Sequence, residues 1–305
     1  MIALLSIVTV VSWGAWIPAA QLIAGIPQRT RTLYAAGGNL VFASAAFAIE
    51  GSRLAIGWRT FWLPFVGGMV WTIGSLCAFR ATQQIGLARA AGTWTPLNIV
   101  TSFVWGAALF AELSGLGTLR WAALAVGAAL VGVGITVVVR SQDAGARSAP
   151  PGERGAGPRA GGRTYRVGLL YGVGAGLLWG SYFVPAQWAK VPAQAANLPL
   201  AFGIFAAAVV LMLPRGAPIR VAPGASAVQL TAGVLFGVGD LALLALVPRV
   251  GTGTGFTIAQ LSLLVNATIG IWAFKVPPPG TPGARRVLFG VVTAAAGGCL
   301  IGALH

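Results

Sequence analysis

The sequence contains few of the ionisable groups that enzymes use for acid–base chemistry and for binding metals. Among 305 residues there are five acidic residues and one histidine, which is the last residue, His305. The acids are scattered along the sequence, and it contains no nucleotide-binding loop of the Walker type. These absences argue against an enzyme with paired carboxylates or a histidine triad. We therefore expect neither catalysis nor a cofactor nor a bound metal.

Charged residues of both signs are also scarce. They make up 8% of the chain, whereas soluble domains carry about 25%. Hydrophobic residues make up 57%, and the mean hydropathy is +0.83. Cys77 and Cys299 both lie in apolar stretches, so a disulfide framework is not expected. This composition predicts an all-α integral membrane protein whose surroundings are the lipid bilayer.

The basic residues give the chain a net charge of +15. They are dispersed through short connections between apolar runs, with one Arg-rich loop. This distribution is typical of membrane topology and not of a basic groove for nucleic acid. We therefore expect no nucleic-acid partner.

A membrane-spanning helix needs about 20 mostly apolar residues. Such runs fall at 2–24, 33–50, 61–80, 91–112, 119–139, 167–188, 198–213, 227–247, 252–274 and 287–304. The segment 141–166 is rich in Gly, Pro and Arg, which predicts a disordered basic linker on the cytoplasmic side. The predicted organisation is a first five-helix repeat at 1–140, this linker, and a second five-helix repeat at 167–305.

Two stretches repeat the same order of residues. Residues 13–21 read WGAWIPAAQ and residues 179–187 read WGSYFVPAQ. A proline inside an apolar helix removes a backbone hydrogen bond and kinks or breaks the helix. Pro18 and Pro185 therefore predict helix breaks at corresponding positions of two duplicated halves, which is where transporters with internal repeats place their sites.

A second alignment supports the duplication. When 68–101 is aligned with 233–266 at a constant offset, Gly74 meets Gly239 and Ser75 meets Asp240. Five helices is an odd number, so the second half enters the membrane in the opposite sense. The sequence therefore predicts an inverted-topology repeat.

The positions of Lys and Arg predict the orientation. With the N-terminus outside, 15 of the 20 basic residues fall in cytoplasmic connections. The positive-inside rule then places both termini outside the cell, in a multi-pass protein of the plasma membrane.

Asp240 is the acidic residue that lies deep inside an apolar run. A carboxylate in the middle of the bilayer is costly, so such residues are protonated, paired or exposed to a wet cavity. Three interpretations remain open: coupling to a proton or another cation, a hydrogen bond to substrate, or a structural bond to a neighbouring helix. Arg249 and Lys275 are possible ionic partners.

Aromatic and uncharged polar side chains recur at helical spacing in both halves. Aromatic faces accept the C–H face of a sugar ring, and amides and hydroxyls bond its hydroxyl groups. Anchoring at the membrane interface and bonding between helices are the alternatives. The candidate substrate-binding residues are Trp13, Trp16, Trp71, Ser75, Trp94, Asn98, Trp179, Ser181, Tyr182, Gln187, Gln260 and Asn266. Their types favour a small neutral polar solute.

The sequence resembles the glucose/ribose uptake permeases of the drug/metabolite transporter superfamily. The resemblance is carried by residues 13–18, 67–89, 179–185 and 255–262, and so extends over both halves. It implies ten helices in two inverted five-helix repeats, sugar uptake with protons, and a cavity between the halves with the fifth and tenth helices peripheral. Asp240 departs from the pattern, because typical members are expected to have an uncharged amide there.

We therefore predict a secondary transporter, a proton-coupled monosaccharide uptake permease that works by alternating access as a monomer or weak homodimer. Export of amino acids or other metabolites is the alternative within the superfamily. A membrane-embedded enzyme or a non-transporting partner subunit is the alternative outside transport.

Overall fold

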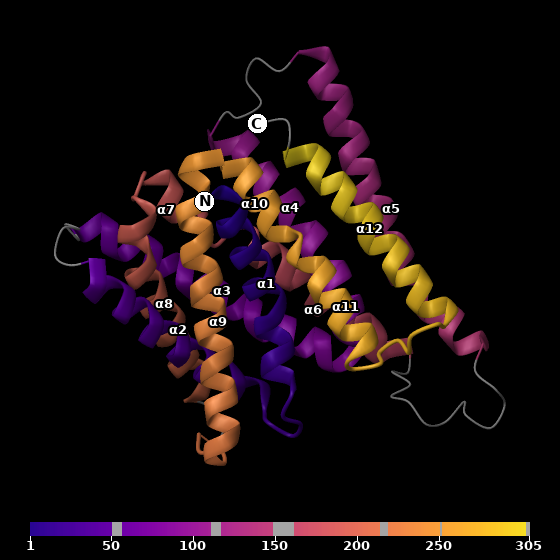
Figure 1. Cartoon of the computed structure of the whole chain (residues 1–305), viewed down its shortest axis with the longest axis horizontal. Helices are drawn as coiled ribbons and strands as arrows, with labels where there is room; N and C mark the ends of the chain where they lie inside the picture. Colours follow the sequence, from indigo (N-terminus) through magenta and orange to yellow (C-terminus); the bar gives the residue numbers. More distant parts are fainter. Residues whose placement is uncertain (51–56, 111–116, 149–161, 214–218, 251, 303–305) are drawn as a thin grey trace.

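The computed structural model describes residues 1–50, 57–110, 117–148, 162–213, 219–250 and 252–302. Within these ranges the chain forms helices and no strand (Figure 1), which confirms the predicted all-α fold. The helices are α1 (Ile2–Gln21), α2 (Gln28–Glu50), α3 (Trp58–Ile85), α4 (Leu87–Phe110), α5 (Thr118–Ser148), α6 (Gly162–Trp179), α7 (Val184–Trp188), α8 (Ala193–Met212), α9 (Pro223–Val250), α10 (Thr252–Gln260), α11 (Ser262–Trp272) and α12 (Pro282–Gly302).

Each predicted apolar run coincides with one long helix or with two helices placed end to end. Nine stretches of the described residues are long and apolar enough to cross a membrane, and α4 adds a helix of 24 residues. The sixth run is divided into α6 and α7, and the ninth into α10 and α11. Both α2 and α4 begin before their predicted boundaries, because arginine is a good helix former and lets the helix continue past the apolar run.

The linker expected at 141–166 is helical at both of its ends. Helix α5 continues to Ser148, and α6 already begins at Gly162. Alanine and arginine favour the helix beyond residue 141, and the first proline of this segment is Pro150. Helix therefore extends into both ends of the predicted linker, and residues 149–161 lie outside the described part of the chain.

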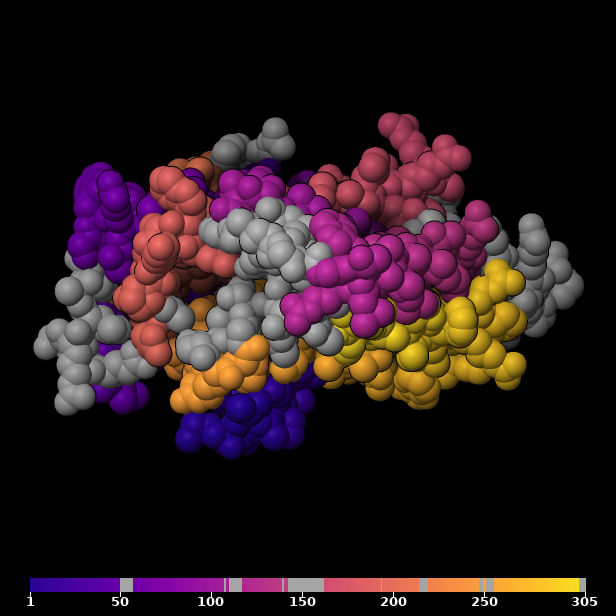
Figure 2. Space-filling model, turned by 90° about the horizontal axis from the view of Figure 1, so that it is seen from above, coloured from indigo at the N-terminus to yellow at the C-terminus, as the bar shows by residue number. Residues whose placement is uncertain are grey.

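The packing of the helices brings the early and late parts of the chain together. Helix α3 packs against α6 and α8, and α9 packs against α1 and α2. Helix α2 also contacts α8, and α4 contacts α11. Helices α5 and α12 pair with each other at one edge of the molecule (Figure 1), and their magenta and yellow atoms lie together at one end in the view from above (Figure 2).

Glycines allow the α5–α12 pair to approach closely. A Cβ atom at Gly134 would lie 2.5 Å from the carbonyl oxygen of Gly290, and one at Gly127 would lie 3.0 Å from that of Gly297. The later residue of α5 thus faces the earlier residue of α12, so the two helices run antiparallel. Small residues at such contacts let backbones pack closely in a membrane.

Glycines also make room for two tryptophan rings nearer the centre of the molecule. A Cβ atom at Gly74 would lie 2.7 Å from Cδ1 of Trp179, and one at Gly239 would lie 2.5 Å from Cδ1 of Trp13. These distances are shorter than side-chain packing allows. The two glycines therefore bring α6 onto α3 and α1 onto α9, where the rings can reach a shared interior.

Candidate functional site

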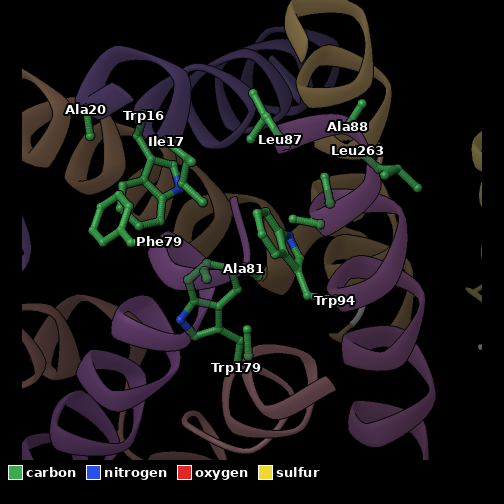
Figure 3. Close-up of a cluster of buried hydrophobic side chains, with 14 of the residues drawn as sticks. Trp16, Ile17, Ala20, Phe79, Ala81, Leu87, Ala88, Trp94, Trp179 and Leu263 are labelled. Carbon is green, nitrogen blue, oxygen red and sulfur yellow. The ribbon is translucent and has the colours of Figure 1, made fainter. Parts of the chain in front are cut away.

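A cavity lies among α1, α3, α4, α6, α9, α10 and α11 and the turn at 180–183. Its lining combines aromatic rings with amides and hydroxyls. The lining residues are Trp13, Trp16, Ile17, Trp71, Trp94, Thr95, Asn98, Trp179, Tyr182, Phe236, Gln260, Ser262 and Asn266. Nine of the residues predicted from the sequence are among them. Figure 3 shows three of these rings, Trp16, Trp94 and Trp179, converging from α1, α4 and α6.

The aromatic side of the cavity is a set of rings in mutual contact. The ring centroids of Trp71 and Phe236 are 4.2 Å apart, and Trp16 lies 5.5 Å from Trp71 and 5.6 Å from Phe236. Trp94 meets Trp179 edge to face at 5.6 Å. Aromatic pairs at such separations are stabilising beyond the area they bury. The rings therefore form a rigid apolar wall.

Hydrogen bonding orients one of these rings and leaves another without a partner. The indole Nε1 of Trp179 donates to the carbonyl oxygen of Trp71 at 3.1 Å. The indole Nε1 of Trp13 is buried and has no hydrogen-bond partner among the described residues. Trp13 also lines the cavity, and its Nε1 atom lies beside Gly239 of α9.

The polar side of the cavity comes from α4, α10 and α11. Gln260 and Ser262 lie on either side of Leu261, where α10 ends and α11 begins. Asn266, one turn further, donates from Nδ2 to the carbonyl oxygen of Ser262 at 3.2 Å, while its Oδ1 has no partner among the described residues. On α4, the Oδ1 atom of Asn98 accepts a bond from the side chain of Ser102 at 3.3 Å. The cavity thus offers uncharged donors and acceptors.

Asp240 lies behind the cavity wall and not on it. Its side chain is 2% exposed, and its Oδ1 accepts a hydrogen bond from the hydroxyl of Tyr182 at 3.4 Å. Neither suggested ionic partner forms an ion pair with it among the described residues, and the guanidinium of Arg249 donates to the carbonyl oxygen of Ala245 on its own helix. The described partner of the acid is therefore a residue that lines the cavity.

Three predicted substrate-binding residues lie outside the cavity lining. The hydroxyl of Ser75 donates to the carbonyl oxygen of Trp71 at 3.1 Å. The hydroxyl of Ser181 donates to the carbonyl of Leu177 at 2.8 Å and accepts from Trp105 Nε1 at 2.8 Å. Serines in helices often bond to the carbonyl four residues earlier, which uses up the hydroxyl group. Gln187 is half-buried on the short helix α7, away from the lining.

The two prolines differ in what they do to the chain. Pro18 lies within α1, which continues to Gln21, so the helix break predicted there was wrong. Helix α1 ends at Gln21, shortly after Pro18. In the second copy the helix does stop, because α6 ends at Trp179 and Pro185 lies in the first turn of α7. Proline suits a first turn because its missing N–H would have no partner there.

Four lining residues were not predicted as part of the site. Thr95 and Ser262 are uncharged polar residues of the type that recurs at helical spacing in both halves, whereas Ile17 and Phe236 are apolar. Phe236 lies four residues before Asp240, so the spacing of one helical turn could have placed it on the same face. Ile17 is an ordinary apolar residue with no signal of its own. Among the described residues, no group of His, Cys, Asp and Glu comes together to hold a metal.

Long apolar helices around a cavity that is aromatic on one side and polar on the other define a membrane protein that binds a small solute. The chain belongs to the sugar transport protein family, whose model matches residues 1–304. This membership confirms the resemblance to sugar uptake permeases that the repeated motifs indicated.

Relatives of this chain share its length but little of its sequence. A protein of Bacillus cereus named "Putative sugar uptake protein" is 24% identical over 263 residues, which cover 86% of this chain and 85% of the relative. A "Putative ribose uptake protein" of Lactiplantibacillus plantarum is 23% identical over 265 residues, covering 85% and 84%. A relative from Listeria monocytogenes is 23% identical over 298 residues, covering 98% and 97%.

The fold also occurs among solved structures. A crystal structure covers 98% of this chain and 96% of its own, with a TM-score of 0.61 and 16% sequence identity. At this identity the likeness shows the fold alone.

Proposed function

We propose that this protein is a monosaccharide uptake permease and that the aromatic and amide-lined cavity binds the sugar. The observation that carries the proposal is the combination within one cavity of a tryptophan wall with uncharged donors and acceptors. A sugar ring has an apolar C–H face and a rim of hydroxyl groups, and the two sides of the cavity complement both. The names of the relatives agree with this substrate class.

Among the described residues, the lining of the cavity carries no charged side chain, which favours an uncharged substrate over a charged one. The lining residues are aromatic, aliphatic, hydroxyl or amide side chains, so a substrate with a net charge would lose its hydration without gaining an opposite charge. A neutral monosaccharide carries no net charge and avoids this cost.

The transport cycle we propose is alternating access between two inverted five-helix repeats. Equivalent contacts in the two halves support this arrangement. Gly74 meets the ring of Trp179 just as Gly239 meets the ring of Trp13; the two glycines are related by the offset of the aligned segments, and the two tryptophans by one residue more. Two further contacts repeat the same offset: Gly68 lies against the carbonyl of Leu200, and Gly233 lies against that of Ala35. Such internal repeats rock against each other around a central site.

Uptake is driven by protons in this proposal, with Asp240 as the group that binds the proton. A carboxylate in the membrane interior is a common element of proton-coupled transport, and Asp240 is joined to the cavity lining by its bond to Tyr182. The distribution of basic residues supports a plasma-membrane orientation with both termini outside. Protons entering down their gradient would then bring sugar into the cell.

The test is transport by the purified protein in liposomes. Labelled glucose and ribose should enter protein-containing vesicles faster than protein-free vesicles, and an inward proton gradient should make the sugar accumulate. Intrinsic tryptophan fluorescence should report sugar binding to the same preparation. If no member of a broad sugar panel enters, while an amino acid or another metabolite changes the fluorescence and is transported, the sugar assignment is wrong.

A further inference from the structure

Tyr182 occupies a position between the cavity and the buried acid. The residue lines the cavity, and its hydroxyl lies 3.4 Å from Oδ1 of Asp240. Asp240 itself is 2% exposed and is not part of the lining. A solute in the cavity can therefore contact Tyr182, whereas Asp240 lies one hydrogen bond further from the cavity.

Among the titratable residues described around Asp240, Tyr182 is the one that hydrogen-bonds to it. Helix α9 packs against α1, α2, α8 and α10, and α1, α8 and α10 contain no acidic, basic, tyrosine, histidine or cysteine residue. The other titratable side chains described on α2 and α9 donate to backbone carbonyl oxygens and not to Asp240. Arg29 donates to Leu211, Arg31 to Ile23 and Ile26, Tyr34 to Ile219, and Arg249 to Ala245. Glu50 is the last residue of α2, and its side chain is not among those described.

The first half of the chain has no such pair. In the repeated motif Trp16 takes the place of Tyr182, and in the aligned helices Ser75 takes the place of Asp240. The ring of Trp16 lies 5.5 Å from Trp71 and 5.6 Å from Phe79, one turn on either side of Ser75. An apolar contact in one half thus corresponds to a tyrosine–carboxylate hydrogen bond in the other.

We infer that Tyr182 couples sugar binding to proton binding, because its single O–H can donate either to Asp240 or to a hydroxyl of a sugar in the cavity. This inference rests on the proposed function. Tyr182 keeps its own proton throughout. The proton that Asp240 gains comes from water on the outer side and leaves to water on the inner side.

The coupling follows from the cost of a buried charge. While Tyr182 donates to Asp240, the carboxylate has a partner and can stay ionised. When a sugar takes over that hydrogen bond, an ionised Asp240 is left buried without a donor, which favours its neutral, protonated form. By reciprocity, protonation of Asp240 releases Tyr182 for the sugar, so sugar and proton strengthen each other's binding.

The experiment measures sugar affinity against pH for the full-length protein in detergent, with glucose and ribose as probes and tryptophan fluorescence as the signal. For the wild type, affinity should rise as the pH falls, by about 5- to 150-fold if the coupling is of ordinary size. Tyr182→Phe should weaken sugar binding and make it independent of pH. In liposomes, this variant should exchange sugar across the membrane but should not accumulate it in response to a proton gradient.

A matched variant controls for the loss of a phenol group. Tyr171 lies outside the cavity lining, where its hydroxyl accepts a bond from Arg80 at 3.0 Å, so Tyr171→Phe should preserve the pH dependence. Asp240→Asn should abolish it, and combining Asp240→Asn with Tyr182→Phe should remove no further coupling, since the two residues act as one unit.

The outcomes separate this inference from the proposed function. Wild-type protein that binds and transports no sugar contradicts the proposed function. Wild-type transport that depends on pH, together with the same dependence in Tyr182→Phe, contradicts the role of Tyr182 alone. If Tyr182→Phe does not fold, a pH dependence that persists in Asp240→Asn overturns the inference instead.

Discussion

At the scale of single residues, the cavity depends on indole rings that are held by more than packing. Trp179 is 8% exposed, is bonded through Nε1 to the backbone of Trp71, and touches three other aromatic rings. A ring fixed in this way presents its face to a substrate with little loss of freedom on binding. We therefore regard Trp179 as the most informative residue of the wall.

Replacing Trp179 by alanine should weaken sugar binding by about tenfold or more, because aromatic contacts contribute about 0.5–1.5 kcal/mol beyond their buried area and 1.4 kcal/mol is a factor of about ten. Trp179→Phe keeps a ring but loses the indole N–H, and should show an intermediate affinity. Trp58 is 77% exposed, and Trp58→Ala is the control that should leave affinity unaltered. Isothermal titration with the sugar distinguishes them, and equal losses at both positions would contradict the assignment of the wall.

Most of the cavity residues could be predicted from sequence because tryptophans and amides at helical spacing share one face of a helix. Ser75 and Ser181 were predicted to bind substrate but lie outside the cavity lining. Their spacing is correct, but each hydroxyl bonds to a carbonyl of its own helix, and sequence does not show which way a serine hydroxyl turns. The same limit applies to Phe236, which is one of many apolar residues until the packing shows which ring it touches.

At the scale of helices, the breaks were harder to predict than the spans. The apolar runs identify the spanning helices because the bilayer demands a minimum length. The interruption between α10 and α11 at Leu261 contains neither proline nor glycine. Just after it, the backbone N–H of Leu264 donates to the carbonyl oxygen of Leu261, which is three residues earlier and not four as in a regular α-helix. Such a break depends on tertiary packing, whereas the interruption between Trp179 and Pro185 has a local cause.

The α5–α12 pair allows a direct test of helix packing. Gly134→Ala places a methyl group against the backbone of Gly290, and should lower stability by about 1–3 kcal/mol, as overpacking does. Gly132, two residues earlier on the same helix, faces open space, so Gly132→Ala should be neutral or should stabilise by about 0.5–1 kcal/mol through helix propensity. Thermal unfolding in detergent compares the two, and a loss of stability at residue 132 equal to that at residue 134 would contradict the close contact.

At the scale of the whole molecule, the proposed orientation predicts which surfaces are accessible from outside the cell. Arg59 and Arg285 are both exposed, near the starts of α3 and α12. In a background without Cys77 and Cys299, Arg59→Cys should react with a membrane-impermeant maleimide in intact cells. Arg285→Cys should react only after the membrane is permeabilised. The reverse pattern would place both termini in the cytoplasm.

The difference between the Tyr182–Asp240 pair and its counterpart, Trp16 beside Ser75, has a consequence for the resting state of the transporter. In an inverted repeat with two identical halves, the inward-facing and outward-facing states would be related by a two-fold rotation and equal in free energy, and an unliganded population would divide evenly between them. A carboxylate present in one half alone removes that equality. Under the proposed alternating access, this charge would bias which way the empty carrier faces, and a change of external pH would shift that bias before any sugar arrives.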